Sequence, residues 1–144
     1  MIVVDTTVLV YAVGDDHPLR EPCRALVEAV NGGDVSATTT VEAIQEFCDV
    51  RSRRRSRADA ATLARSYAEL FSPLLAVDAD DLVDGLELFA KTDSLGAFDA
   101  VIAATARRRA DGLVSADAAF STVRGLRHLD PATPGFLDDL RSAT

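Results

Sequence analysis

The sequence predicts an α/β fold in which helices cover both faces of a central parallel sheet. Short apolar runs alternate with longer stretches that have the apolar spacing of helices along the whole chain, which is the pattern of βαβ crossovers. The 144 residues are close to the usual size of one domain, and no linker or internal repeat interrupts them. We therefore expect one α/β/α sandwich over residues 1–144.

Five short apolar runs are expected to form the strands of this sheet. They cover residues 2–4, 35–37, 74–77, 113–115 and 126–129. The first run leads past Asp5 and two threonines into Val8-Leu9-Val10, which we expect to form a turn or a helix. Strands that are separated by helices in this way pair in parallel.

The first two long helices are expected between these strands. Pro18 suits the first position of a helix, and apolar residues recur at spacings of three and four up to Val30, where residues 31–33 end the helix. Thr39 and Glu42 have the T-x-x-E spacing of a capping box, so the next helix is expected to begin there.

Four further helices complete the predicted fold. They are expected over residues 58–71, from Asp78 to Phe89, over residues 95–106 and around residues 136–140. Ser72-Pro73 ends the first of them, Asp78 caps the second, and Gly112 follows the third.

The composition excludes several classes of protein. The hydrophobic fraction of 48% argues against a disordered chain, and the longest apolar runs are far too short to span a bilayer. No signal peptide can be recognised at the N-terminus, so a cytoplasmic protein is expected. Cys23 and Cys48 lie among apolar residues without the spacing of a metal site, and both are expected to be small core residues.

Charge is distributed unevenly along the chain. The net charge of −8 disfavours a chain that coats nucleic acid, yet six arginines between Arg51 and Arg65 face Asp59 alone. Exposed charges act over only about 8–10 Å in salt, so the arginines from Arg51 to Arg57 could hold a phosphate backbone locally. They could equally be a solvated helix end or a contact for an acidic partner protein, and the sequence leaves this choice open.

Four carboxylates lie where the predicted strands end. Asp5 follows the first strand directly, and Asp117 lies two residues after the strand at 113–115. Glu42 lies in the first turn of the helix after the second strand, and Asp99 opens the apolar run of a later helix. Because ligands bind beyond the carboxyl ends of parallel strands, we expect these acids to converge at one edge of the sheet.

A cluster of carboxylates indicates a cation, because like charges at close range repel and raise one another's pKa. Oxygen ligands without His or Cys suit Mg²⁺ or Mn²⁺. A site of this kind can activate water and stabilise the leaving oxygen of a phosphodiester. Taken singly, each acid is more simply explained as a turn or capping residue, and the convergence of four is what favours a metal site.

Other polar residues are expected to be structural. Asp78, Asp80, Asp81 and Asp84 crowd the start of one helix, where the helix dipole favours acids. His17 and His128 lack partners in the sequence and are expected to be solvent or turn residues.

Three ordered motifs resemble those of the PIN-domain ribonucleases. They are IVVDTTVLVYA at residues 2–12, FDAVIAATA at 98–106 and LVSADAAF at 113–120. The resemblance covers essentially the whole chain, and the compact length is similar to that of VapC toxins, the ribonuclease halves of type II toxin–antitoxin pairs. It implies an α/β/α sandwich and Mg²⁺- or Mn²⁺-dependent cleavage of single-stranded RNA, such as tRNA or rRNA loops. It also implies a small antitoxin as partner and a homodimer.

The resemblance also assigns residues to the site. By position, the metal-binding and catalytic acids would be Asp5, Glu42, Asp99 and Asp117. Glu46 lies one turn after Glu42 on the same helix face, within a Gln45-Glu46-Phe47 string that is similar to one in family members. The T-x-x-E spacing at Thr39 favours Glu42, and Glu46 stays as the second choice.

Hydroxyl residues accompany these acids. Thr7 stands where many relatives carry Asn, and Ser115 stands where Thr is frequent. Both can still donate hydrogen bonds, so these departures cast little doubt on activity. Thr6 and Ser115 are candidates to orient Asp5, Asp117 or a metal-bound water.

Two other functions remain as alternatives. An aspartyl-phosphate phosphatase also places its nucleophile after a first apolar strand, but it needs an Asp where this chain has Thr7, and Lys91 is the only lysine present to hold a phosphate. A PIN-like module that binds RNA or protein without cleavage would be expected to lack some of the acids, all four of which are present. An RNA cleavage assay with and without a chelator separates these possibilities.

Overall fold

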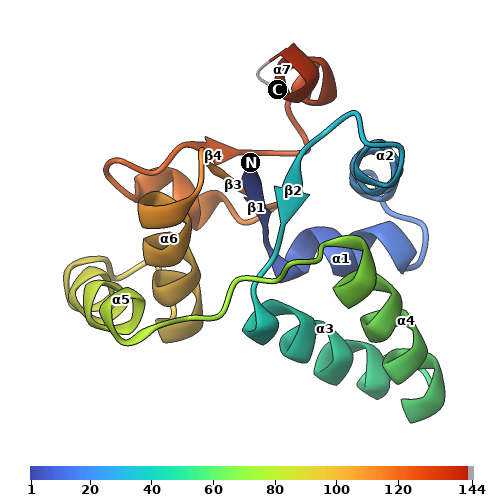
Figure 1. Cartoon of the computed structure of the whole chain (residues 1–144), viewed down its shortest axis with the longest axis horizontal. Helices are drawn as coiled ribbons and strands as arrows, with labels where there is room; N and C mark the ends of the chain where they lie inside the picture. Colours follow the sequence, from blue (N-terminus) through green and yellow to red (C-terminus); the bar gives the residue numbers. More distant parts are fainter. Residues whose placement is uncertain (143–144) are drawn as a thin grey trace.

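The computed structural model describes residues 1–142, and these form an α/β sandwich around a parallel sheet (Figure 1). The strands are β1 (Ile2–Val4), β2 (Ala37–Thr38), β3 (Leu113–Val114) and β4 (His128–Leu129), in the order β2-β1-β3-β4. The helices are α1 (Thr6–Val13), α2 (Arg20–Asn31), α3 (Val41–Arg54), α4 (Arg57–Leu70), α5 (Ala79–Lys91), α6 (Ala97–Arg109) and α7 (Phe136–Ser142), with a 3₁₀ helix η1 (Ala118–Thr122). The predicted fold class is confirmed.

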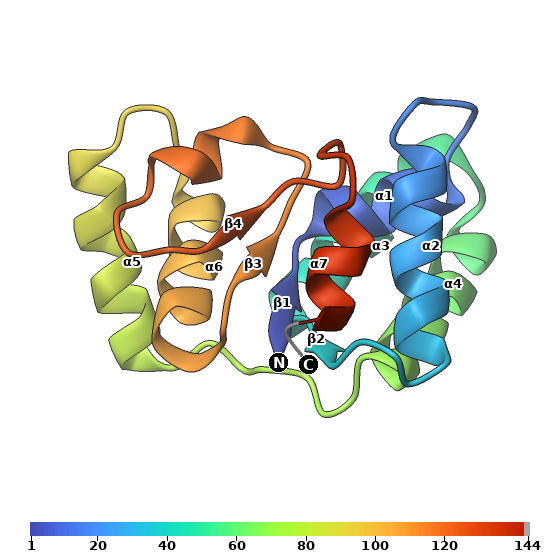
Figure 2. The same cartoon turned by 90° about the horizontal axis from the view of Figure 1, so that it is seen from above.

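The helices form two layers, one on each face of the sheet. Figures 1 and 2 show α5 and α6 on one side of the strands, with α1 to α4 and α7 on the other. Strand β1 supplies both cores because successive side chains of a strand point to opposite faces. Ile2 and Val4 pack in the core with α1 to α4, whereas Val3 and Leu113 pack against the small side chains of α6. None of the helices in residues 1–142 is long and apolar enough to cross a membrane.

The predicted strand at 74–77 is wrong. Only Leu75 pairs with the sheet edge, where its N–H donates to the carbonyl of Thr39 and its carbonyl accepts from the N–H of Val41. The pairing stops there because β2 ends at Thr38 and Thr40 already caps α3. The segment instead crosses from α4 to α5 on the other side of the molecule (Figure 1).

The other boundaries differ from the prediction by a few residues. Strand β2 covers residues 37–38 instead of 35–37, strand β4 is reduced to residues 128–129, and helix α2 begins at Arg20, two residues after Pro18. Such ends depend on which neighbouring strand a backbone group reaches, so local pattern determines them poorly.

The predicted capping box of Thr39 and Glu42 is also wrong. The cap of α3 is Thr40, whose hydroxyl accepts a hydrogen bond from the Ala43 N–H at 3.1 Å. Thr39 is fully buried and still belongs to the extended segment beside β1, where its hydroxyl donates to the Val4 carbonyl at 2.6 Å. The argument that favoured Glu42 over Glu46 therefore loses its basis.

Candidate functional site

The candidate site is a pocket at the carboxyl edge of the sheet, where three helices begin. Asp5 is the N-cap of α1, and α3 and α6 also start beside this edge. The pocket has a volume of about 280 Å³. It is lined by Asp5, Thr6, Thr40, Glu42, Ala43, Glu46, Val77, Leu82, Leu86, Ala97, Phe98, Asp99, Val101 and Ile102. Three of the four predicted acids thus line one pocket, together with Glu46.

Asp5 is held in place by its neighbours. Its side chain is buried, and its Oδ2 atom accepts hydrogen bonds from the hydroxyls of Thr7 and Ser115, both at 2.8 Å, and from the Thr7 N–H at 3.4 Å. All of these bonds fall on one oxygen, so Oδ1 is the atom that remains for a ligand. The carboxylate is oriented before any ligand arrives.

Ser115 connects Asp5 to Asp117. The Ser115 hydroxyl, which donates to Asp5, also accepts from the Asp117 N–H at 3.0 Å, and it lies 3.3 Å from the Thr7 hydroxyl. The Asp117 carboxylate is exposed and caps η1 by accepting from the Ala119 N–H at 2.8 Å. One buried hydroxyl therefore fixes the end of β3 against the start of α1, and Asp117 follows at the same edge.

His128 supports this arrangement from β4. Its Nε2 atom lies 2.9 Å from the Ser115 carbonyl, which can only accept, so Nε2 carries the proton. The prediction of a solvent or turn residue missed this contact because its partner lies on the neighbouring strand.

Glu46 and Glu42 both line the pocket, but only Glu46 is tied to the opposite helix. The Thr6 hydroxyl donates to Glu46 Oε2 at 2.7 Å, and Thr6 follows Asp5 directly in the chain. Both glutamates are exposed, and the Glu42 side chain, one turn earlier on α3, forms no hydrogen bond or ion pair with any side chain or backbone group of residues 1–142. The geometry brings Glu46 to the acids more closely than the first choice from the sequence.

Asp99 shows that the acids interact. It lies half-buried in the first turn of α6. Burial, followed by the negative charges of Asp5, Asp117 and Glu46, raises the pKa of Asp99 to about 6. These four carboxylates therefore share one electrostatic site, although Asp117 does not line the pocket.

The chemistry of these groups fits a hard divalent cation. In residues 1–142 none of the pocket acids has a Lys, Arg or His partner within ion-pair distance, and their oxygens are the ligands that Mg²⁺ and Mn²⁺ prefer. Over the same residues, no three Asp, Glu, His or Cys side chains are close enough to hold an ion as they stand. Mg²⁺ suits such a site because it keeps several water ligands.

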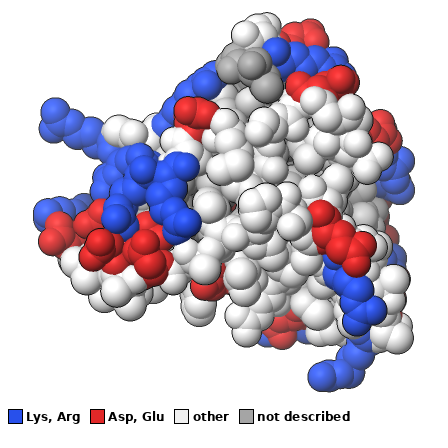
Figure 3. Space-filling view, viewed as in Figure 1, with Lys and Arg blue, Asp and Glu red and all other residues white. Residues whose placement is uncertain are grey.

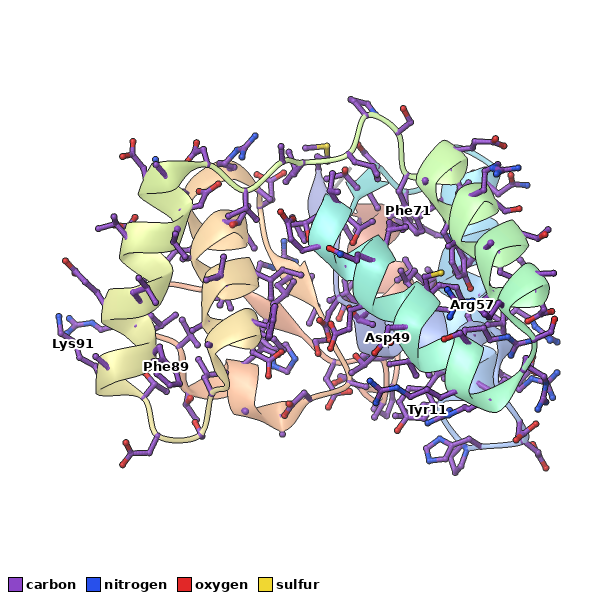
Figure 4. The ribbon with its side chains drawn as sticks, turned by 90° about the horizontal axis from the view of Figure 1, so that it is seen from below. Tyr11, Asp49, Arg57, Phe71, Phe89 and Lys91 are labelled. Carbon is purple, nitrogen blue, oxygen red and sulfur yellow. The ribbon has the colours of Figure 1, made fainter. Side chains whose placement is uncertain are left out.

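The arginine cluster lies at the far end of α3, and three of its five members between Arg51 and Arg57 form ion pairs. Arg51 donates to Asp59 at 2.7 Å and to the Val13 carbonyl at 3.1 Å, which ties α3 to α4 and α1. Arg53 pairs with Asp49 and Arg55 with Asp15. Figure 4 shows Asp49 and Arg57 on the side of the molecule away from α5 and α6.

One component of the pocket was not recognised from the sequence, namely its apolar wall. Leu82 and Leu86 of α5 and Phe98 of α6 line the pocket and are exposed. Their spacing predicted only that they lie on helices, and a helix that faces a core shows this spacing. The same spacing results when an apolar face is left open, so periodicity could not distinguish the two.

Comparison with known proteins gives one family match and several relatives. The PIN domain family model matches residues 2–126. The chain is 48% identical over 142 residues to Ribonuclease VapC7 of Mycobacterium tuberculosis (strain ATCC 25618 / H37Rv), which covers 95% of this chain and 96% of that protein. It is 38% identical over 112 residues to Ribonuclease VapC23 of the same strain, with 76% and 86% covered. Ribonuclease VapC13 is 28% identical over 132 residues, with 90% and 99% covered.

Proposed function

The chain belongs to the PIN-domain family, and on this premise we propose that its acidic pocket is the active site of a VapC-like, divalent-metal-dependent endoribonuclease. The observation that carries this proposal is the group of carboxylates around Asp99 that no cationic side chain of residues 1–142 compensates. Burial of Asp99 and the charges of the other acids raise the pKa of Asp99. A structural cluster of acids would be paired with arginines, whereas this cluster has its pocket open to a ligand.

We assign Asp5, Asp99 and Asp117 to the catalytic, metal-binding role, with Glu46 as the fourth acid and Glu42 as the alternative. A bound Mg²⁺ or Mn²⁺ would neutralise these acids, activate water and stabilise the leaving oxygen of the phosphodiester. The hydroxyls of Thr7 and Ser115 hold Asp5 through one oxygen and leave the other turned to the ligand. Thr6 holds Glu46 in the same way from the opposite side.

The substrate that fits this assignment is single-stranded RNA, such as the loop of a tRNA or an rRNA. A carboxylate pocket that binds cations attracts phosphate groups only through the cation, so RNA binding should depend on the metal. The phosphatase is not favoured, because Thr7 occupies the position of its acid and holds Asp5 instead. The non-catalytic module is not favoured, because all four acids are present.

The test is cleavage of a single-stranded RNA by the purified chain. Cleavage is expected in Mg²⁺ or Mn²⁺, loss of cleavage in EDTA, and recovery when the metal is restored in excess. Cleavage that continues unchanged in EDTA would contradict the metal site, and binding of RNA without any cleavage in either metal would favour the non-catalytic alternative.

We also propose the partners that the family implies. A small antitoxin should neutralise the ribonuclease, and co-expression of the neighbouring open reading frame should suppress its activity. The family resemblance also implies a homodimer, to be tested by sedimentation. We treat residues 1–144 as one PIN domain that acts in the cytoplasm.

A further inference from the structure

The pocket has two chemically different walls. One wall carries the carboxylates of Asp5, Glu46 and Asp99, and the other is formed by apolar side chains of α5 and α6. Figure 4 shows α3, which carries Glu46, on one side and the α5–α6 pair on the other, and Asp99 lies on α6, so the carboxylates and the apolar side chains meet at the first turn of that helix. A ligand that fills this pocket must present charge to one side and an apolar surface to the other.

Phe98 is the most exposed large apolar residue of this wall. Its side chain is 81% exposed, whereas Leu82 and Leu86 are 46% and 50% exposed. The buried face of α6 consists of small residues such as Ala100 and Ala103, which pack against the sheet, so Phe98 contributes nothing to that core. Exposing an aromatic ring to water costs free energy, and the packing of α6 does not offset this cost at Phe98.

Phe98 precedes Asp99 directly in the chain, and both lie in the first turn of α6. Both side chains line the same pocket, so they present an aromatic ring and a carboxylate to one ligand at a spacing that the helix sets. The helix holds this spacing rigidly. A residue of RNA combines the same two chemistries, because an anionic phosphate is joined to a flat base with apolar faces.

We propose that Phe98, together with Leu82 and Leu86, forms a base-binding subsite in which a nucleobase next to the cleaved phosphate stacks on the Phe98 ring. This inference rests on the proposed ribonuclease function and adds a residue that positions the substrate. Stacking on an aromatic ring accepts any base, because every base has a π-face. The subsite therefore sets the position of the strand and leaves the sequence preference to other contacts.

The chain contains no tryptophan, so Phe98→Trp introduces a single fluorescent reporter at the subsite. We would make it in an Asp117→Asn background to slow cleavage, and titrate it with a short single-stranded RNA in Mg²⁺ while RNA binding is followed by anisotropy. We expect the tryptophan fluorescence to be quenched in parallel with the RNA binding that anisotropy reports. Binding without quenching would overturn the subsite.

Val83→Trp in the same background is the matched control. Val83 is 55% exposed on α5 but does not line the pocket, so its tryptophan should not respond to RNA. Equal quenching at both positions would overturn a specific subsite. The fluorescence of the Phe98→Trp variant could instead change with protein concentration and not with RNA. That result would mean that a second copy of the chain covers the ring, and it would also overturn the subsite.

Kinetics give an independent test. Phe98→Ala should raise KM roughly 5- to 150-fold, which corresponds to the loss of one stacked base, with kcat and the melting temperature nearly unchanged. Phe98→Tyr should restore KM, and Val83→Ala should leave it unchanged. An unaltered KM in Phe98→Ala would overturn the proposal, whereas failure of the unmodified chain to cleave any RNA would overturn the proposed function and the subsite with it.

Discussion

Two groups of aspartates in this molecule have opposite environments. Asp78, Asp80, Asp81 and Asp84 surround the guanidinium of Arg108 at the start of α5, and Figure 3 shows red and blue side chains lying together at this end. The backbone N–H of Asp81 and the Arg108 guanidinium hold the pKa of Asp78 below its ordinary value. The acids around Asp99 have no such partners, and the pKa of Asp99 is raised.

The difference indicates which acids need a ligand. An acidic group that the protein itself neutralises contributes to folding, as Asp81 does by joining α5 to Arg108 and Arg109 of α6. An acidic group that the protein leaves uncompensated stores repulsion that a bound cation, or protonation of one acid, relieves. The number of acids is similar in the two places, so the distinction lies in the partners.

The largest expected effect is on catalysis. Asp99→Asn should reduce RNA cleavage by on the order of a hundredfold or more, because it removes a charge that binds the metal, while circular dichroism shows an intact fold. Asp80→Asn is the matched control, since the Asp80 side chain is 84% exposed and belongs to the paired group. Loss of cleavage in the control but not in Asp99→Asn would reverse the comparison.

Metal binding should increase the free energy of unfolding of the protein. Mg²⁺ or Mn²⁺ at a hundredfold excess over its Kd should stabilise the fold by about 2.7 kcal/mol, provided that the unfolded chain does not bind it. The melting temperature should rise with metal, fall back in EDTA, and respond much less in Asp99→Asn. A melting temperature that is indifferent to both metals would count against the site.

Asp81→Asn should affect stability in the other group. Asp81 is fully buried, and its two oxygens accept from Arg108 at 2.7 Å and Arg109 at 3.1 Å. Removal of this charge should cost about 2 kcal/mol in denaturant unfolding, less than for a fully buried pair because both arginines reach water. Cleavage per folded molecule should stay normal, and a specific loss of kcat would place Asp81 among the functional acids.

The next prediction decides which of Glu46 and Glu42 belongs to the uncompensated group of acids around Asp99. The two lie about 6 Å apart along α3, so they cannot serve the metal equally. Because Thr6 holds Glu46 towards Asp5, Glu46→Gln should lose about tenfold more activity than Glu42→Gln. A larger loss in Glu42→Gln, measured as kcat in the same assay, would return the role to Glu42.

The pH dependence of stability in EDTA tests the uncompensated acids without any metal. The folded state raises the pKa of Asp99 from 3.8 to about 6, so it binds that proton more tightly than the unfolded chain does. The resulting stabilisation is fully present below pH 3.8 and is lost as the pH rises through about 6. Unfolding measured across this range should show the loss in the unmodified chain and not in Asp99→Asn; equal curves would argue against the raised pKa.

The sequence by itself determined the fold class and the positions of three acids. Asp5 follows β1 and Asp99 opens α6 because apolar runs and helical spacing are local patterns that a linear chain displays directly. The carboxyl ends of parallel strands share one edge, so the placement of Asp5 and Asp117 together followed from strand direction alone.

Only the tertiary structure decided which acids are neutralised by a partner on another element, because these contacts join segments far apart in the chain. Thr6 selects Glu46 across 40 residues, and Arg108 neutralises Asp81 across 27. The exposure of Phe98 likewise depends on what fails to cover it, since an apolar residue has the same spacing in a core and on an open face. Local pattern encodes which element a residue occupies, whereas its charge partner and its solvent exposure are set by packing between elements.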